Sequence, residues 1–247
     1  MPRFELQIFG DESTAPGLIT YGLVVFSDSN HERQARYRWQ KVLRSFGADG
    51  RARTHARELF SGQARAKTCW SHLNESETSA LVESLVRTIK EEGAIFSLGV
   101  ADVSTYPEKG VPDGLDESGN QRFIKWKPSL FYGFALLAAV TGLKSSVPAM
   151  QQGCPYKLFL DPISEAVKLF TDLNAVQVIN LIQTIGLKPT TFSEEPLLLD
   201  AADLFAYASG RALSKEAARN KQVCTNIYNL TGAFKTDWFW DTTTPAG

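Results

Sequence analysis

The sequence holds few of the side chains that build disulfide scaffolds or thiolate metal sites. Among 247 residues there are three cysteines and three histidines, and no Cys-x-x-Cys pair occurs. Because an odd number of widely spaced cysteines disfavours both disulfides and zinc sites, we expect reduced thiols and a cytoplasmic protein. All three histidines fall between residues 31 and 72. Neither a Cys–His nor a Ser–His–Asp nucleophilic site is therefore indicated.

Long apolar runs and phosphate-cradling glycine loops are also missing. The longest apolar stretch, Leu130 to Val140, is too short to cross a bilayer, so no membrane association is expected. No basic segment followed by an apolar core opens the chain, so we predict no signal peptide. The glycine pattern of a P-loop does not occur. With 43% hydrophobic and 21% charged residues, the composition is that of a folded globular domain.

The opening stretch, Phe4 to Ser13, predicts a strand that ends in two carboxylates. Its apolar and polar residues alternate, which is the period of a strand with one buried face. Asp11 and Glu12 follow directly. A carboxylate at the end of a buried strand is poorly solvated, and binding to a metal ion or a strong donor lowers that cost. The alternative is an ordinary loop that begins with acids.

Basic residues are concentrated between Arg33 and Lys67. This segment holds ten Lys and Arg residues against two acidic ones, a net charge of +8, whereas the whole chain carries −1. A localised positive surface is typical of proteins that bind phosphates. The alternative is a solvated helix face whose charge is balanced by the acidic remainder.

The remaining segments alternate between strand and helix periods. We expect strands near 18–26, 94–102, 156–161 and 189–192, and helices near 30–46, 76–91, 128–143 and from 196. This order indicates an α/β domain with a mixed central sheet flanked by helices. We predict one domain over 1–247, with a basic helical insertion at about 30–70, a mobile loop at about 104–125 and a C-terminal extension from about 215.

Four short motifs occur in order along this pattern. They are Asp11-Glu12-Ser13, Arg57-Glu58-Leu59, a strand ending in Leu158-Phe-Leu-Asp161, and Ala202-Asp203-Leu204-Phe205-Ala206 on a late helix. In this order they resemble the family called domain of unknown function 3800. The resemblance implies a ribonuclease H-like fold and one site made by Asp11, Glu58, Asp161 and Asp203.

Elementary electrostatics agrees with that implied site. Two carboxylates about 4 Å apart repel by about 4 kcal/mol at an effective dielectric of 20, so a cluster of them needs cations. Mg²⁺ or Mn²⁺ takes such oxygen ligands, and a pair of ions would stabilise the attacking and leaving oxygens of an in-line displacement. The leading hypothesis is a metal-dependent, nuclease-like hydrolase that cleaves phosphodiester bonds in RNA or DNA.

Several alternatives remain open. Asp102 also ends an apolar strand and rivals Asp161, and Asp200 could act outside the metal shell. A second Asp-Glu-Ser, at Asp116, follows a turn and is interpreted as a decoy. Because Thr14 and Asp200 depart from the family pattern, a non-catalytic module that binds nucleic acid or protein is a second hypothesis. A metal-dependent phosphatase for small molecules is the third, and would lead if the basic segment lay far from the acids.

Overall fold

A mixed six-stranded sheet forms the centre of the protein. The computed structural model describes residues 5–106, 110–125, 128–152, 154, 156–160, 191–192, 196–216 and 220–238. Within these residues the strand order is β7-β6-β1-β2-β3-β8. β1 to β3 are antiparallel neighbours, whereas β6 runs parallel to β1, β7 to β6 and β8 to β3. The strands span Leu6–Ala15 (β1), Leu18–Phe26 (β2), Ile95–Asp102 (β3), Tyr156–Leu160 (β6), Thr191–Phe192 (β7) and Phe234–Trp238 (β8).

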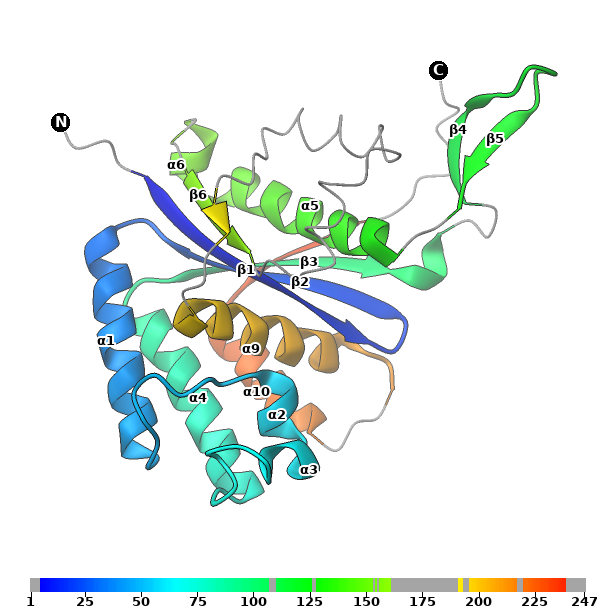
Figure 1. The fold of residues 1–247 in the computed structure, drawn as a ribbon. Helices are drawn as coiled ribbons and strands as arrows, with labels where there is room; N and C mark the ends of the chain where they lie inside the picture. Colours follow the sequence, from blue (N-terminus) through cyan, green and yellow to red (C-terminus); the bar gives the residue numbers. More distant parts are fainter. Residues whose placement is uncertain are drawn as a thin grey trace.

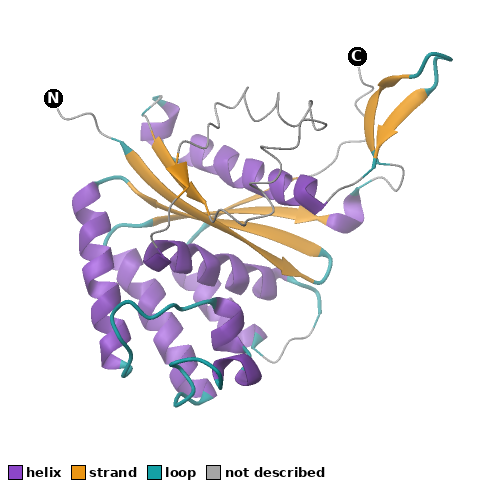
Figure 2. Ribbon diagram, in the orientation of Figure 1, coloured by secondary structure: helices purple, strands orange, loops and turns teal. Residues whose placement is uncertain are grey.

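Helices cover both faces of this sheet, which confirms the α/β class with a mixed sheet (Figures 1 and 2). One face carries α5 (Pro128–Ser146), with α6 (Pro148–Gln151) after it. The other carries α1 (Ser29–Ser45), α2 (Ala56–Phe60), α3 (Gly62–Arg65), α4 (Glu75–Glu91), α9 (Pro196–Leu213) and α10 (Lys221–Thr231). No helix in the described residues is long and apolar enough to cross a membrane.

The two faces of β1 supply two separate cores. Phe9 belongs to the core under α1, α4 and α9, whereas Leu6 and Ile8 belong to the core under α5. Thr14 keeps the same alternation, since its hydroxyl lies 2.8 Å from that of Tyr132 on α5. Odd-numbered residues of β1 therefore face α9, and even-numbered residues face α5. β2 is buried along almost its whole length, as expected for a central strand.

The predicted end of β1 is wrong. Asp11 and Glu12 lie inside the strand, paired with Gly22 and Tyr21, and the ladder continues to Ala15. Hydrogen bonding to β2 carries the strand onward, and half-exposed positions at this end accommodate the polar side chains. The acids are thus presented from the side of a strand rather than from a loop.

Two glycines let the helices contact the sheet closely. A Cβ on Gly22 would lie 3.0 Å from the backbone nitrogen of Ala206 on α9. A Cβ on Gly99 would overlap the carbonyl oxygen of Ala135 on α5. Any larger side chain at these positions would push a helix away from the strands.

Other predicted elements need correction. The helix predicted near 30–46 begins one residue earlier, because the Asp28 carboxylate caps α1 and accepts the Asn30 N–H at 2.5 Å. The stretch expected to be a mobile loop instead contains a hairpin, β4 (Val111–Leu115) and β5 (Gln121–Ile124). Its turn is held by Asp116, which accepts the N–H groups of Ser118 and Asn120. The second Asp-Glu-Ser is therefore an exposed hairpin turn, and the Pro and Gly residues that suggested a loop lie in and around this hairpin.

Within the predicted C-terminal extension, the described residues 220–238 belong to the folded core. α10 packs on α9, and β8 pairs with β3 at the edge of the sheet. Trp238 stacks on Phe134 of α5 with ring centroids 5.4 Å apart. The expected basic insertion at 30–70 is made of α1, α2 and α3. Asp161 follows the last described residue of β6 and lies outside the described residues.

Candidate functional site

Carboxylates on α9 hold the segment that leads into α2. Asp200 and Asp203 lie in the second turn of α9, and each accepts hydrogen bonds from residues 53–56. Figure 1 shows α2 lying directly against α9 on the side away from the sheet. These bonds fix α2 and the residues that precede it, 53–55, relative to α9.

Asp200 is a buried anchor. Its side chain is fully enclosed, and it accepts Thr54 N–H at 2.7 Å, the Thr54 hydroxyl at 3.2 Å and Arg53 Nε–H at 2.8 Å. Burial raises the pKa of the Asp200 carboxyl, while the Thr54 N–H and the Arg53 charge oppose that rise. Three donors on one carboxylate indicate a structural role for Asp200, which holds residues 53 and 54 in place.

Asp203 caps α2 and orients a histidine. Its Oδ2 accepts the N–H of Ala56 at 2.8 Å and lies 3.3 Å from Nδ1 of His55. His55 occupies the N-cap position of α2 but makes no capping bond of its own, so Asp203 supplies the acceptor. The hydrogen bond to Asp203 raises the pKa of His55. His55 was missed in the sequence because its partner lies 148 residues away.

Asp11 lies on the same face of the sheet as α9. It is odd-numbered like Phe9, and it pairs directly with Gly22, the position against which α9 packs at Ala206. Asp203 lies three residues before Ala206, one turn along the same helix. The two predicted site residues from opposite ends of the chain are therefore brought to one side of the sheet.

Glu58 lies on α2, whose first N–H, that of Ala56, is bound to Asp203. Glu58 is half-buried. Burial of Cys69 raises the pKa of its thiol, and the negative charge of Glu58 raises that pKa further. Glu58 is thus within electrostatic range of Cys69. No hydrogen bond in the described part of the chain joins the Glu58 side chain to Asp203.

Asp102 is too far from Asp11 to replace Asp161. The register places Asp102 opposite Leu18, and Leu18 opposite Ala15, so two strand spacings and four residues separate the two acids. These amount to about 10 Å across and about 13 Å along the sheet. Leu160, the residue before Asp161, pairs instead with Gly10, the residue before Asp11. The register therefore rules out Asp102 as a partner of Asp11.

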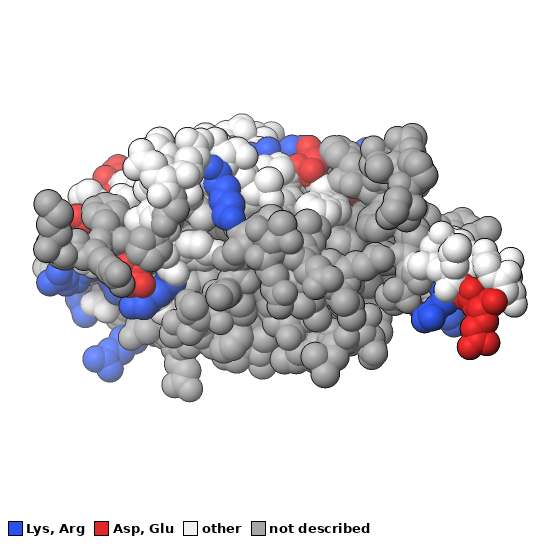
Figure 3. All heavy atoms as spheres, turned by 90° about the horizontal axis from the view of Figure 1, so that it is seen from above, with Lys and Arg blue, Asp and Glu red and all other residues white. Residues whose placement is uncertain are grey.

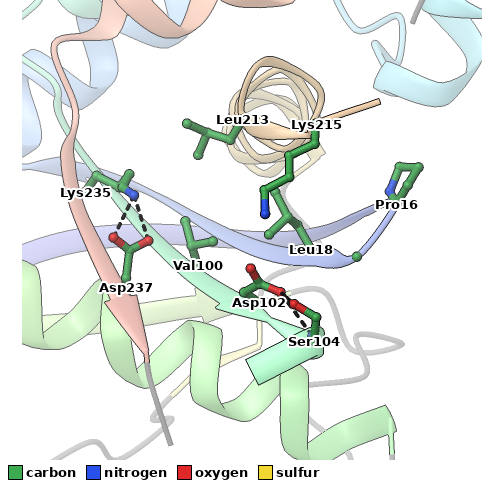
Figure 4. A pocket seen from close by; sticks show the side chains of 10 residues that line it. Pro16, Leu18, Val100, Asp102, Ser104, Leu213, Lys215, Lys235 and Asp237 are labelled. Atoms are coloured by element: carbon green, nitrogen blue, oxygen red, sulfur yellow. Dashed lines mark hydrogen bonds and ion pairs between the residues drawn. The ribbon is translucent and has the colours of Figure 1, made fainter. Parts of the chain in front are cut away.

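Asp102 belongs to a separate cavity of about 320 Å³ beside the turn between β1 and β2 (Figure 4). Asp102 accepts the N–H and hydroxyl of Ser104, and Lys235 is paired with Asp237 at 2.6 Å. Lys215 projects over the cavity from the end of α9. Three of these four charged side chains thus already have partners within the protein.

The described carboxylates do not form a closed metal centre by themselves. Among the described residues, no three His, Cys, Asp or Glu side chains lie close enough together to hold a metal ion. Asp11, Glu58 and Asp203 are described residues, so these three side chains do not form such a group on their own. Asp161 lies outside the described residues, and the cluster of all four therefore stays a prediction.

The basic segment is partly neutralised by its own fold. Arg38 pairs with Glu91 and Glu92, and Arg53 pairs with Asp200. Arg65 is buried and donates to the carbonyls of Leu59 and Leu73. These three arginines therefore hold the helical layer together, and the remaining basic side chains carry the available charge.

Viewed from the α5 side (Figure 3), the basic and acidic side chains of the described residues are interspersed. The basic segment lies on the other side of the sheet, beside α9 (Figure 1). It contacts Asp203, one of the predicted site residues, through His55 and Ala56.

Comparisons of the chain with protein-family models, with curated proteins and with solved structures found no match. The family resemblance accordingly rests on the four motifs and their order.

Proposed function

We propose that this protein is a ribonuclease H-like, metal-dependent nuclease that hydrolyses phosphodiester bonds in nucleic acid. The observation that carries the proposal is the meeting of Asp11 and α9 on one face of the sheet, at Gly22 and Ala206. The parallel pairing of β6 with β1 supports Asp161 as a further member, because Leu160 lies beside Gly10. The proposed ligand set is Asp11, Glu58, Asp161 and Asp203.

The residue types of this set suit Mg²⁺ or Mn²⁺, which take carboxylate oxygens and retain water or substrate phosphate as further ligands. Asp11, Glu58 and Asp203 do not by themselves form a group that could hold an ion, so the proposed set needs Asp161. When bound, such ions supply an activated water and stabilise the charge on the leaving oxygen. Ligating carboxylates are usually oriented by hydrogen bonds from neighbouring groups. Asp203 meets this condition, since Ala56 N–H and His55 fix its Oδ2.

His55 has a proton-transfer role in this proposal. Its ring is about two-fifths exposed and is oriented by Asp203, so the second ring nitrogen can reach a substrate oxygen. The Asp203 carboxylate favours the imidazolium form, which can donate a proton to the departing oxygen.

Nucleic acid is the substrate class that the charge distribution favours. The +8 segment is joined directly to the α9 acids through Arg53 and His55. A phosphatase for small molecules was the better interpretation only if this segment lay far from the acids. Because the segment is adjacent, its basic side chains would guide a phosphate backbone toward the carboxylates.

A cleavage panel tests the proposal. Single-stranded and double-stranded RNA, DNA and hybrid substrates are incubated with Mg²⁺, Mn²⁺ or EDTA, and Asp11→Asn is run beside the wild type. We expect metal-dependent cleavage of at least one substrate that Asp11→Asn abolishes. Cleavage that persists in EDTA, or in Asp11→Asn, would contradict the mechanism.

The second candidate function is a non-catalytic module that binds nucleic acid or a protein. The observation in its favour is that both α9 aspartates have structural tasks, Asp200 as an anchor and Asp203 as a cap. Calorimetry with Mn²⁺ separates the two functions. Heat of binding that Asp11→Asn removes supports the nuclease, and its absence in the wild type supports the module.

A further inference from the structure

A cavity of about 330 Å³ lies two helical turns along α9 from Asp203. It is bounded by α2, α3, α4, α9 and the start of α10, and its volume is at the lower end of the range for ligand pockets. Of the described residues that line it, Arg65 and Arg211 are basic and Glu75 is acidic. The cavity therefore has a net positive lining.

Arg211 is the unusual member of this lining. Its Nε–H is buried without a hydrogen-bond partner among the described residues. Its guanidinium lies over the Tyr207 ring, 5.4 Å from the centroid, and Tyr207 in turn stacks on Phe60. An aromatic face holds the cation in position but does not replace the hydrogen bonds lost on burial.

Arg65 in the same cavity shows the opposite arrangement. Its Nε–H donates to the Leu73 carbonyl at 3.1 Å, and its Nη1 donates to the Leu59 carbonyl at 2.6 Å. The protein thus satisfies one guanidinium of the cavity and leaves the Nε–H of the other unsatisfied. Arg211 as a whole is partly exposed and lines the cavity, and a planar guanidinium binds phosphate oxygens in pairs.

Tyr207 offers a second donor toward the same space. Its hydroxyl oxygen accepts from Asn220 Nδ2 at 3.3 Å, so its own proton can be directed to a ligand. Tyr207 and Arg211 follow Asp203 along the side of α9 that faces α2. Eight residues separate Asp203 from Arg211, about 12 Å along a helix, a distance that a strand bound at Asp203 can span within a few nucleotides.

We infer that this cavity is a phosphate subsite in which Arg211 and Tyr207 bind a backbone phosphate a few nucleotides from the cleaved bond. The inference rests on the proposed nuclease function for the identity of the ligand. The phosphate itself follows from the partly exposed Arg211 guanidinium, the net positive lining and the size of the cavity.

Thermal unfolding in EDTA tests the subsite without any catalytic step. Inorganic phosphate should raise the melting temperature of the wild type, since a ligand that binds only the folded state stabilises it. Arg211→Gln should melt no lower than the wild type in phosphate-free buffer, because it removes a buried N–H that has no partner, and phosphate should not stabilise it. A purely structural arginine would give a lower melting temperature. That result, or an equal phosphate response in both proteins, would overturn the inference.

Oligonucleotide binding tests the identity of the ligand. By fluorescence anisotropy in EDTA, Arg211→Gln should weaken binding of a labelled oligonucleotide about tenfold. Arg87→Gln, an exposed position on α4 with the same change in charge, is the matched control and should change affinity much less. Arg211→Lys keeps the charge but not the paired donors, and should weaken binding nearly as much as Arg211→Gln. Equal affinities for Arg211→Gln and Arg87→Gln would overturn the nucleic-acid assignment. Loss of cleavage activity alone would bear on the proposed function and not on this subsite.

Discussion

At the level of single residues, the two aspartates of α9 differ in what their carboxylates hold. Asp200 is 1% exposed and engaged by a charged side chain, a hydroxyl and a backbone N–H. Asp203 is partly open, and only its Oδ2 is engaged by the α2 segment. Asp203 is therefore the better candidate for contact with a cation, and Asp200 for holding the surrounding backbone.

Asparagine substitutions should separate these roles. Asp203→Asn should abolish metal-dependent cleavage, because the amide keeps the shape and removes the charge that holds the cation. Asp200→Asn should lower cleavage about tenfold, as expected for a residue that positions others. It should also lower the free energy of unfolding by about 1–3 kcal/mol, because the amide leaves Thr54 or Arg53 unsatisfied. Cleavage assays and urea unfolding measure both effects. The reverse ranking of activity between fully folded variants would move the fourth ligand to Asp200.

The titration of His55 offers a test that needs no activity. Because Asp203 raises the pKa of His55, the folded protein binds this proton more tightly than the unfolded chain does. The resulting stabilisation is complete below about pH 6.5, the usual histidine value, and is lost as the pH rises through the folded-state value. In Asp203→Asn the pKa of His55 should fall, as measured by NMR titration of its ring proton. His55→Gln assigns the signal, and an unchanged midpoint would show that Asp203 does not set this pKa.

At the level of elements, the sequence predicted most helices and strands because their signals are local. The start of α4 is an example, since it carries a capping box in which Asn74 and Glu77, three residues apart, make both reciprocal bonds. The end of β1 was placed too early, since an acidic residue says nothing about the backbone partner that β2 supplies. The β4–β5 hairpin was missed for the opposite reason, because its Pro and Gly residues suggested a loop.

The site was only partly predictable for the same physical reason. Asp11 and Asp203 were chosen from motifs, and the register and α9 packing bring them to one face. The bonds from Thr54, His55 and Ala56 to α9 span about 146–148 residues and have no periodic signal. Tertiary contacts of this kind decide which of several acids are structural, and a sequence pattern does not contain them.

The packing of α9 on β2 can be tested at Gly22. An added methyl group there would lie 2.7 Å from Phe205 Cδ1 and 3.0 Å from the backbone nitrogen of Ala206. Gly22→Ala should therefore lower the free energy of unfolding by about 1–3 kcal/mol. It should also reduce cleavage, because α9 carries Asp203. Urea unfolding and cleavage rates measure the two effects.

Gly62→Ala is the matched control for that substitution. No atom lies within 4 Å of the position of its added methyl group, and the residue begins α3. Its stability should stay equal or rise by up to about 1 kcal/mol, since alanine favours the helix. Equal stability of Gly22→Ala and the wild type would show that α9 can move away from the sheet at little cost.

At the level of the whole molecule, the net charge of −1 conceals a basic segment that lies next to the α9 aspartates. Internal ion pairs reduce the free positive charge of that segment, because Arg38 and Arg53 are already paired with carboxylates. The charge of Arg36 is partly neutralised, since it pairs with Glu32. Its guanidinium lies over the ring of Phe9, which precedes Asp11 by two residues on β1. Arg44 is exposed and forms no ion pair with the described residues. Fewer basic side chains are therefore available to bind a phosphate backbone than the sequence count of ten suggests.

The salt dependence of nucleic-acid binding measures that available charge. Each phosphate contact that is lost should reduce the slope of log K against log salt by about 0.9. Arg44→Gln should reduce it by about that amount, and the double variant Arg36→Gln and Arg44→Gln by up to about twice as much. Arg38→Gln is the control, because Glu91 and Glu92 already neutralise Arg38, so its slope should match the wild type. Identical slopes for all four proteins would leave α1 as a solvated face, and would require the backbone to be bound elsewhere.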